Sequence, residues 1–392
     1  MSCNSDLADF AVRLRRFICA SANVPENGYE HRQGGNGKTI PDQPAFDQLA
    51  LDLFGLQFTH NTPYRRFCET RRVRPQTLTH WTEIPAIPAA AFKELDLSCL
   101  PAEERNAVFL SSGTSGQTPS RHFHNPQSLA VYEASAFPWF TTHLLPSGDQ
   151  PGGLTDAPWQ LAILTPPPSS APNSSLVHMF DTIRRAFGFS ETAFLASLAE
   201  TGWSLDLEAV RKILEESSTT KQPLTILGTA FSFVHLLDHL ADCNLHFRLP
   251  PGSRVLETGG YKDRSRSLPK QALHALITQR LDIPPTHIVC EYGMSELSSQ
   301  AYDTAAGPLR STLDAPRLFR FPPWARVQII SPETGVTVGD GETGLIRVLD
   351  LANVYSVAAL QTEDLGIRQG DGFKLIGRAT LAEPRGCSLM AT

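Results

Sequence analysis

The amino-acid sequence predicts an α/β fold with a β-rich segment near its carboxyl-terminal end. Between residues 106 and 300, short apolar runs alternate with stretches of helical spacing, as expected for a sheet flanked by helices. Beyond residue 320, apolar runs are separated by glycine and aspartate turns, which favours strands. The 392 residues, of which 41% are hydrophobic, are enough to bury a large core.

The first hundred residues are expected to be mainly helical. Residues 6–21 and 46–56 carry apolar side chains at helical spacing. The segment between them, 23–43, is rich in glycine, asparagine and proline and is predicted to be a loop. Two prolines within residues 84–97 exclude a long helix there and predict an extended strap.

The remaining elements follow from short apolar runs and helical periodicity. Strands are predicted at 107–110, 161–165, 224–227, 254–257 and 288–290, and later at 327–330, 344–349 and 373–376. Helices are predicted at 129–137 and 231–240.

Composition excludes several classes of protein. The net charge of −6 disfavours a general nucleic-acid binder. No apolar run approaches the ~20 residues of a membrane span, and the first 22 residues lack the apolar centre of a secretion signal. The seven cysteines form no CxxC pair, so reduced thiols in the cytoplasm are expected.

Several familiar motifs are absent or out of context. Residues 339–344 match G-x-G-x-x-G, but a strand-like segment follows where a dinucleotide-binding site needs a helix, so we expect a turn between strands. The Walker A, HExxH and GxSxG patterns are missing. His122 and His124 could share one strand face, and we expect them to be surface residues rather than metal ligands.

The sharpest local signal is a run of hydroxyl-bearing residues and glycines after the strand at 107–110. Such a loop can offer backbone N–H groups and hydroxyls to polyphosphate oxygens, although a plain surface turn has a similar composition. The residues are Ser111, Ser112, Gly113, Thr114, Ser115 and Gly116.

Two further segments carry candidate ligands for a nucleotide. In Tyr292–Gly293–Met294–Ser295–Glu296, the carboxylate of Glu296 could hold Mg²⁺ beside phosphates, or simply begin a helix. In the TEDLG segment, Asp364 could accept hydrogen bonds from both ribose hydroxyls, with Arg378 nearby, or be a turn residue.

The order of these segments resembles the motif ladder of adenylate-forming enzymes, the superfamily of acyl-CoA synthetases, adenylation domains and luciferases. The ladder is SSGTSG, a Gly-Gly pair after a strand, YGMSE, GETG, TEDLG and GR. The closer resemblance is to the acyl-protein synthetases of bacterial luminescence (LuxE-like). It rests on NTPYRRFC (61–68), IPAIPAAAFK (84–93), RHFHNPQSLAVYEAS (121–135), EYGMSELSSQAY (291–302) and AEPRGCSL (382–389).

The resemblance implies cofactors and residue roles. ATP and Mg²⁺ would be used, and the fold would be an adenylate-forming domain with mixed and parallel sheets flanked by helices. The serine–glycine loop would hold the β,γ-phosphates, and Gly259 and Gly260 would line the adenine pocket. Tyr292, followed by Gly293, would stack on adenine. Ser295 would contact the α-phosphate, Glu296 would hold Mg²⁺, and Asp364 and Arg378 would bind the ribose.

Two departures from the wider superfamily bear on the acyl acceptor. Arg121 stands near where a lysine often closes the phosphate loop, and the mobile lysine-bearing C-terminal domain is not expected. We expect an adenylate-forming domain at 1–378, with a helical part (1–105) and an ATP-binding core (106–378), and a tail at 379–392. The tail contains Cys387, which matches the acyl-accepting cysteine of LuxE-like proteins, whereas Cys290 is expected to be core.

The function implied is ATP-dependent activation of a long-chain fatty acid, its transfer to Cys387 as a thioester and hand-over to a partner acyl reductase (LuxC-like). One alternative is transfer of an acyl or aryl group to coenzyme A or a carrier protein. Another is a scaffold of a reductase complex without catalysis. The acid, its chain length and the oligomeric state, homo- or hetero-oligomer, stay open.

Overall fold

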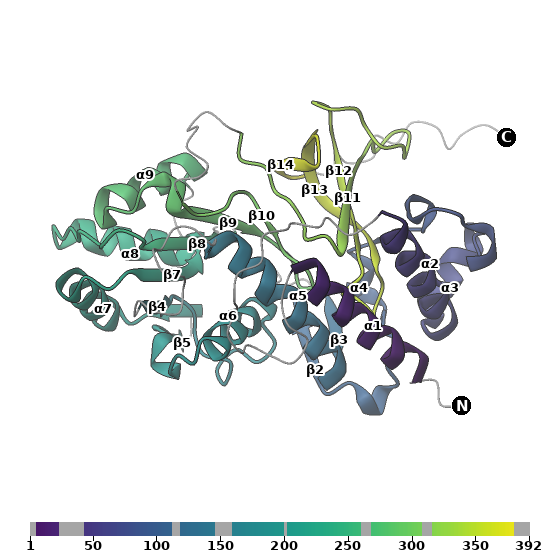
Figure 1. Ribbon diagram of the computed structural model, residues 1–392, viewed down its shortest axis with the longest axis horizontal. Helices are drawn as coiled ribbons and strands as arrows, with labels where there is room; N and C mark the ends of the chain where they lie inside the picture. The colour runs from purple at the N-terminus through teal and green to yellow at the C-terminus, as the bar shows by residue number, and fades with distance from the viewer. Residues whose placement is uncertain are drawn as a thin grey trace.

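Two five-stranded sheets form the frame of the computed structural model (Figure 1). The structure describes residues 5–22, 43–111, 118–145, 159–199, 202–259, 268–307 and 316–379. The first sheet has the order β10-β9-β8-β7-β4, in which β4, β7, β8 and β9 are parallel and β10 is antiparallel. Its strands are β4 (Gln160–Ile163), β7 (Leu224–Thr229), β8 (Arg254–Thr258), β9 (Ile288–Tyr292) and β10 (Ala301–Tyr302).

Helices cover both faces of this sheet, as parallel sheets require. Alternate strand residues face opposite layers: Leu256 and Val289 pack against one helix pair, and Val255 and Ile288 against the other helices. The first layer is α5 (Pro126–Leu144) and α6 (Ser175–Ala186), and the second is α7 (Leu207–Thr220), α8 (Ala230–Asp242) and α9 (Lys270–Leu281).

The second sheet has the order β1-β13-β12-β11, with β14 paired to β13. Only β1 is parallel to its neighbour, and the other pairs are antiparallel. The first three helices share its buried core and lie at the other end of the molecule from α7, α8 and α9 (Figure 1). The strands are β1 (Ile87–Pro88), β11 (Ala325–Ile330), β12 (Thr343–Asp350), β13 (Ala359–Gln369) and β14 (Gly372–Arg378), and the helices are α1 (Ser5–Ala22), α2 (Gln43–His60) and α3 (Thr62–Thr70).

Smaller elements complete the chain. The hairpin β2 (Ala107–Leu110) and β3 (Arg121–His124) brackets the serine–glycine loop, and a second hairpin joins β5 (Ala196–Ala199) to β6 (Gly202–Leu205). A short helix, α4 (Ala91–Glu94), follows β1. The single-turn 3₁₀ segments are Pro75–Thr77, Trp81–Glu83, Ala102–Glu104, Glu191–Ala193 and Pro285–His287.

The predicted α/β architecture and β-rich end are confirmed, and most predicted elements lie within a few residues of the observed ones. The strap is correct in part: it pairs as β1 with β13, but it also contains α4. The glycine-rich segment 339–344 leads into β12, as expected of a turn between strands. The predicted loop at 23–43 lies almost entirely outside the described residues.

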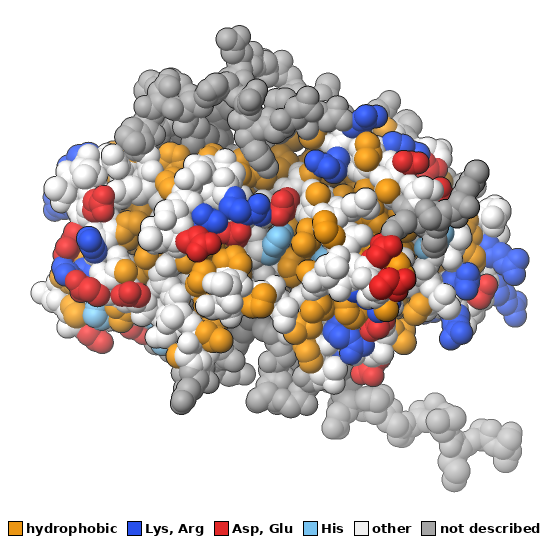
Figure 2. Space-filling model, turned by 90° about the horizontal axis from the view of Figure 1, so that it is seen from below, with side chains coloured by type: hydrophobic (Ala, Val, Ile, Leu, Met, Phe, Trp, Pro, Cys, Tyr) orange, Lys and Arg blue, Asp and Glu red, His pale blue; other side chains and the backbone are white. Residues whose placement is uncertain are grey.

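Surface charge is mixed, with a basic region at one end. Figure 2 shows Lys and Arg side chains gathered at the end of the molecule where α2 and α3 lie. The arginines of α3 and the turn after it are Arg65, Arg66, Arg71, Arg72 and Arg74. Within the described residues, no helix combines the length and apolar character needed to cross a membrane.

Candidate active site

Two of the predicted site segments begin where neighbouring parallel strands end. β8 ends at Thr258, followed by Gly259, and β9 ends at Tyr292, followed by Gly293. Carboxyl ends of parallel strands meet at one edge of a sheet, where ligands of open α/β sheets bind. Gly259 has a φ of +70°, which favours glycine, and its exposed backbone lies at this edge. Gly260 lies outside the described residues.

A hydrogen bond joins Tyr292 to Asp364 across 72 positions of sequence. The Tyr292 hydroxyl donates to Asp364 Oδ2 at 2.8 Å. Arg378 is paired with Asp364 in the β13–β14 register, and its Nε lies 3.9 Å from Asp364 Oδ1. Burial raises the pKa of Asp364. The Arg378 side chain is 82% exposed, so this long ion pair adds little to stability and leaves the guanidinium accessible.

The Tyr292 ring is fixed by an aromatic cluster. Its side chain is buried and contacts Phe319, Phe321 and Phe373 with ring centroids 6.0, 6.2 and 5.6 Å away. Such edge and tilted contacts hold a ring in one orientation. Stacking of this ring on adenine stays a prediction.

Ser295 and Glu296 lie in an irregular, buried turn beside this cluster. The Ser295 hydroxyl donates to Glu296 Oε2 at 3.0 Å, and the Glu296 carbonyl accepts from Asn353 Nδ2 at 2.8 Å. The alternative that Glu296 begins a helix is wrong, because residues 293–300 form turns and bends. The Ser295 hydroxyl therefore bonds its carboxylate, and Asn353 holds its backbone carbonyl.

The hairpin β2–β3 closes the base of the serine–glycine loop. The Ser111 N–H donates to the Ser120 carbonyl at 3.2 Å, and the Ser120 N–H donates to the Ser111 hydroxyl at 2.8 Å. Ser112, Gly113, Thr114, Ser115 and Gly116 lie outside the described residues. Arg121, the candidate substitute for a closing lysine, is paired with Asp96 at 2.9 Å.

His122 and His124 do share a strand face, but the prediction that they are surface residues is wrong. Their side chains are 3% and 1% exposed, and their ring centroids lie 4.2 Å apart. His122 Nδ1 lies 2.9 Å from the Ser295 carbonyl, and His124 Nδ1 lies 3.1 Å from the Ser128 hydroxyl. Strand alternation predicted the shared face, whereas their burial depends on tertiary packing.

Glu291, which the sequence analysis did not single out, lies directly behind the site. It is buried, accepts a hydrogen bond from the Thr258 hydroxyl and so links the ends of β8 and β9. Burial raises its pKa to about 7. The detectable signal was a carboxylate inside the otherwise apolar strand β9, since such a group needs a specific partner.

Glu291 predicts a pH-dependent stability. Its pKa is raised above the ordinary 4.5, so its contribution to stability is full below about pH 4.5 and is lost as pH rises through 7. Glu291→Gln should therefore raise the free energy of unfolding by about 2 kcal/mol more at pH 8 than at pH 5. Urea unfolding of both proteins measures this, and an equal effect at the two pH values would contradict it.

Gly293 is needed because the Glu291 carboxylate packs against its α-carbon. A methyl group at Gly293 would overlap Glu291 Oε1, and the hydrogen bond with Thr258 restrains that oxygen's carboxyl group. Gly293→Ala should lower the free energy of unfolding by about 1–3 kcal/mol, as overpacking does. Chemical denaturation tests this, with Gly335→Asn, at an open left-handed turn, as a tolerated control.

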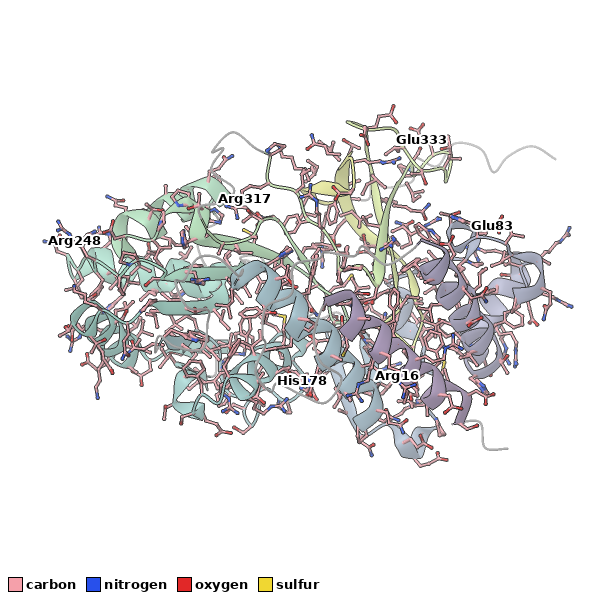
Figure 3. All side chains as sticks on the ribbon, viewed as in Figure 1. Arg16, Glu83, His178, Arg248, Arg317 and Glu333 are labelled. Atoms are coloured by element: carbon pink, nitrogen blue, oxygen red, sulfur yellow. The ribbon has the colours of Figure 1, made fainter. Side chains whose placement is uncertain are left out.

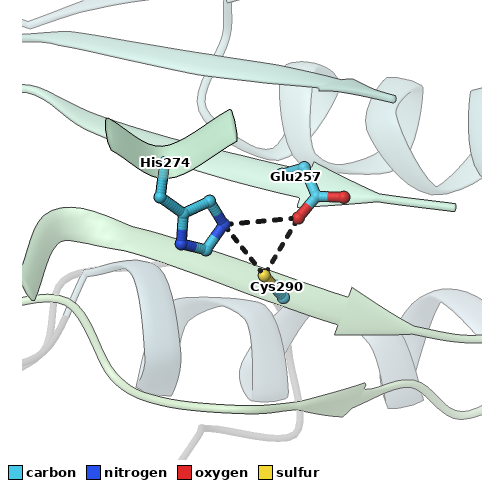
Figure 4. Close-up of side chains that lie close together, drawn as sticks. All are labelled: Glu257, His274 and Cys290. Atoms are coloured by element: carbon cyan, nitrogen blue, oxygen red, sulfur yellow. Dashed lines mark hydrogen bonds and ion pairs between the residues drawn. The ribbon is translucent and has the colours of Figure 1, made fainter. Parts of the chain in front are cut away.

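Three buried side chains with metal-ligating atoms meet on the other side of β8 and β9 (Figure 4). Cys290 Sγ lies 3.0 Å from Glu257 Oε2 and 3.4 Å from His274 Nε2, and the last two atoms are 3.5 Å apart. The prediction that Cys290 is core is confirmed, since it is 1% exposed. Burial also raises the pKa of its thiol, which makes it a poor nucleophile.

Neighbouring cations argue against a metal in this cluster. Lys270 interacts electrostatically with Cys290, Glu257 and Asp303. Arg317, labelled in Figure 3, donates to both oxygens of Asp303 at 2.8 Å. The carboxylates of Glu257 and Asp303 are thus balanced by the cations of Lys270 and Arg317. A divalent ion would add a charge that no buried group nearby, in the described part of the chain, compensates. We interpret the cluster as a packed polar network on the face of β8 and β9 opposite to Glu291.

Comparison with known proteins identifies the family. The chain matches the model of the LuxE acyl-protein synthetase family over residues 41–392. A long-chain-fatty-acid–luciferin-component ligase of Aliivibrio fischeri is 22% identical over 355 residues, covering 88% of this chain and 86% of that protein. A Vibrio harveyi protein with the same name is 21% identical, covering 87% and 86%.

The fold also matches a solved structure of an adenylate-forming ligase. A 2-hydroxyisobutyryl-CoA ligase in complex with 2-HIB-AMP and CoA aligns with a TM-score of 0.57 and 13% identity, covering 89% of this chain and 80% of that chain. At this identity the match shows the fold alone. Because the family model spans nearly the whole chain, this protein belongs to the LuxE family of acyl-protein synthetases, and it is a ligase.

Proposed function

We propose that this ligase uses Mg·ATP to activate a long-chain fatty acid and then carries the acyl group as a thioester on Cys387. The observation that carries the proposal is the meeting of two distant segments: Asp364 on β13 accepts a hydrogen bond from Tyr292, which lies three residues before Ser295 and four before Glu296. The names of the relatives support a long-chain fatty acid as substrate.

In the first step, a carboxylate oxygen of the acid attacks the α-phosphorus of ATP. A new P–O bond forms, the bond to the bridging oxygen of the β-phosphate breaks, and pyrophosphate leaves. Asp364 would accept hydrogen bonds from the ribose hydroxyls and Ser295 would donate to the α-phosphate, so that the reacting atoms stay aligned.

The residues present fit a magnesium ion. Glu296 offers a buried carboxylate whose one hydrogen bond, within the described residues, comes from Ser295, so an acceptor atom remains. A magnesium ion held there would neutralise charge on the phosphates. The chain's part is to hold the Glu296 backbone through Asn353.

In the second step, the thiolate of Cys387 would attack the carbonyl carbon of the acyl-adenylate. A C–S bond forms, the C–O bond to AMP breaks, and the thiol proton goes to solvent. The acyl group would then pass to a partner acyl reductase of the LuxC type. Cys387 lies outside the described residues, so this step is supported by the family resemblance and by thiol chemistry.

The test is incubation of the purified protein with Mg·ATP and a panel of fatty acids, followed by intact mass and pyrophosphate measurement. We expect a mass gain equal to the fatty acid minus one water, which neutral hydroxylamine removes. Pyrophosphate release without a mass gain would favour transfer to coenzyme A or a carrier protein. With neither signal, the proposal that this chain activates a long-chain fatty acid fails.

A further inference from the structure

The inner face of the hairpin that carries the serine–glycine loop contacts the Ser295–Glu296 turn. His122 is the second residue of β3, immediately after the segment that closes the loop. Its side chain is buried, and Nδ1 lies 2.9 Å from the Ser295 carbonyl oxygen. This hydrogen bond connects the hairpin directly to the turn.

The chemistry of this contact fixes the state of the ring. A carbonyl oxygen only accepts, so Nδ1 must carry a proton. Burial lowers the pKa of His122 to about 4, so the ring is neutral at pH 7 and its single proton is on Nδ1. Phe92 meets the ring edge-on at 5.9 Å, which limits the ring's freedom to turn.

The Ser295–Glu296 turn is thereby held on both sides. His122 binds the Ser295 carbonyl from β3, and Asn353 binds the Glu296 carbonyl at 2.8 Å from the segment after β12. The two amide planes cannot rotate without breaking one of these bonds. Their orientation determines where the Ser295 hydroxyl and the Glu296 carboxylate lie relative to the hairpin.

We propose that His122 is a positioning residue of the adenylation step: its Nδ1–H locks the Ser295–Glu296 turn against the hairpin that bears the serine–glycine loop. The inference rests on the proposed function. In-line attack at a phosphorus atom tolerates little misplacement, and groups that orient a metal ligand commonly contribute about 10–100-fold in activity. One imidazole on β3 thus ties the hairpin to the Ser295–Glu296 turn.

Two variants distinguish the contribution of the Nδ1–H group from that of Nε2. His122→Asn places an amide N–H near the position of Nδ1, whereas His122→Gln places it near Nε2. We expect His122→Gln to lower kcat for acid-dependent pyrophosphate release about 10–100-fold, with a smaller change in KM for ATP. His122→Asn should keep more activity: the logarithm of its fall in kcat should be at most half of that for His122→Gln. Thermal midpoints of both variants should agree within a few degrees.

His124→Gln is the matched control. This residue is as buried as His122 and on the same strand face, but its Nδ1 bonds the Ser128 hydroxyl at the start of α5. It should change stability and leave kcat within about threefold. Equal kcat losses in His122→Gln and His124→Gln, or no recovery in His122→Asn, would overturn the positioning role.

A measurement on the wild-type protein keeps the inference testable if the variants do not fold. Long-range ¹H–¹⁵N spectra of histidine-labelled protein should show His122 as the neutral tautomer protonated on Nδ1 between pH 6 and 8. A ring protonated on Nε2 alone would overturn the inference, because it has no Nδ1–H to donate to the Ser295 carbonyl. Wild-type protein that releases no pyrophosphate with any acid would instead remove the proposed function.

Discussion

Asp364→Ala is expected to abolish most adenylate formation while the protein stays folded. The variant removes the acceptor of the Tyr292 hydroxyl and the candidate acceptor of the ribose hydroxyls. Hydrogen bonds to a charged group contribute about 1.5–3 kcal/mol each, so loss of two corresponds to about a 100-fold fall or more in kcat/KM for ATP. Acid-dependent pyrophosphate release measures the change.

Glu363→Ala is the control for this prediction. Glu363 is the preceding residue of β13, has an exposed side chain and faces the opposite side of the strand. Its activity should stay within about threefold of the parent. Tyr292→Phe, which removes only the hydroxyl, should give an intermediate loss. Unchanged pyrophosphate release in a folded Asp364→Ala protein would remove the ribose assignment.

The sequence predicted the order of the site segments but not their distances. Tyr292 and Asp364 were singled out separately, and no local pattern shows that a tyrosine hydroxyl donates to a carboxylate 72 positions away. That contact exists because β13 lies between β1 and β12 and also pairs with β14. Long-range pairing of this kind is decided by the whole sheet.

β13 was also the longest strand that the sequence analysis missed. Its residues 361–364 are polar and are followed closely by Gly366, so the segment resembles a turn. The strand persists because it is hydrogen-bonded on both sides, and Gly366 packs closely against Ile329 and Ile346. The candidate ribose ligand Asp364 therefore lies in a strand whose residues 361–364 lack the usual apolar alternation.

One missed helix was predictable, and the buried histidines were not. Asp206 caps α7 by accepting from the Ala209 N–H, and Val210 and Leu214 then recur at helical spacing, so both signals were present in the sequence. For His122, the strand pattern predicted that it shares a face with His124, but it did not predict which residues cover that face. Phe92 of α4 and the Ser295 turn cover that face.

Cys387→Ala is expected to uncouple the two half-reactions. Adenylate formation should continue, because no residue assigned to the nucleotide is altered, whereas the hydroxylamine-sensitive mass gain should disappear. An ordinary free thiol is only about 3% ionised at pH 7, so a specific acceptor must be near the adenylate or be activated. Burst pyrophosphate release and intact mass from one reaction separate the two steps.

Cys243→Ala is the matched control for the acceptor. Cys243 follows α8, is exposed and lies 3.8 Å from His239 Nε2, so it is an accessible thiol with a potential base beside it. Among the other described cysteines, Cys68, Cys99 and Cys290 are buried and Cys19 is half-buried, so Cys243, which is exposed, is the most stringent comparison. Its variant should acylate fully. If Cys387→Ala still gains the acyl mass and Cys243→Ala does not, the thioester is formed on α8's end rather than on the tail, and the assignment of the acceptor must move there.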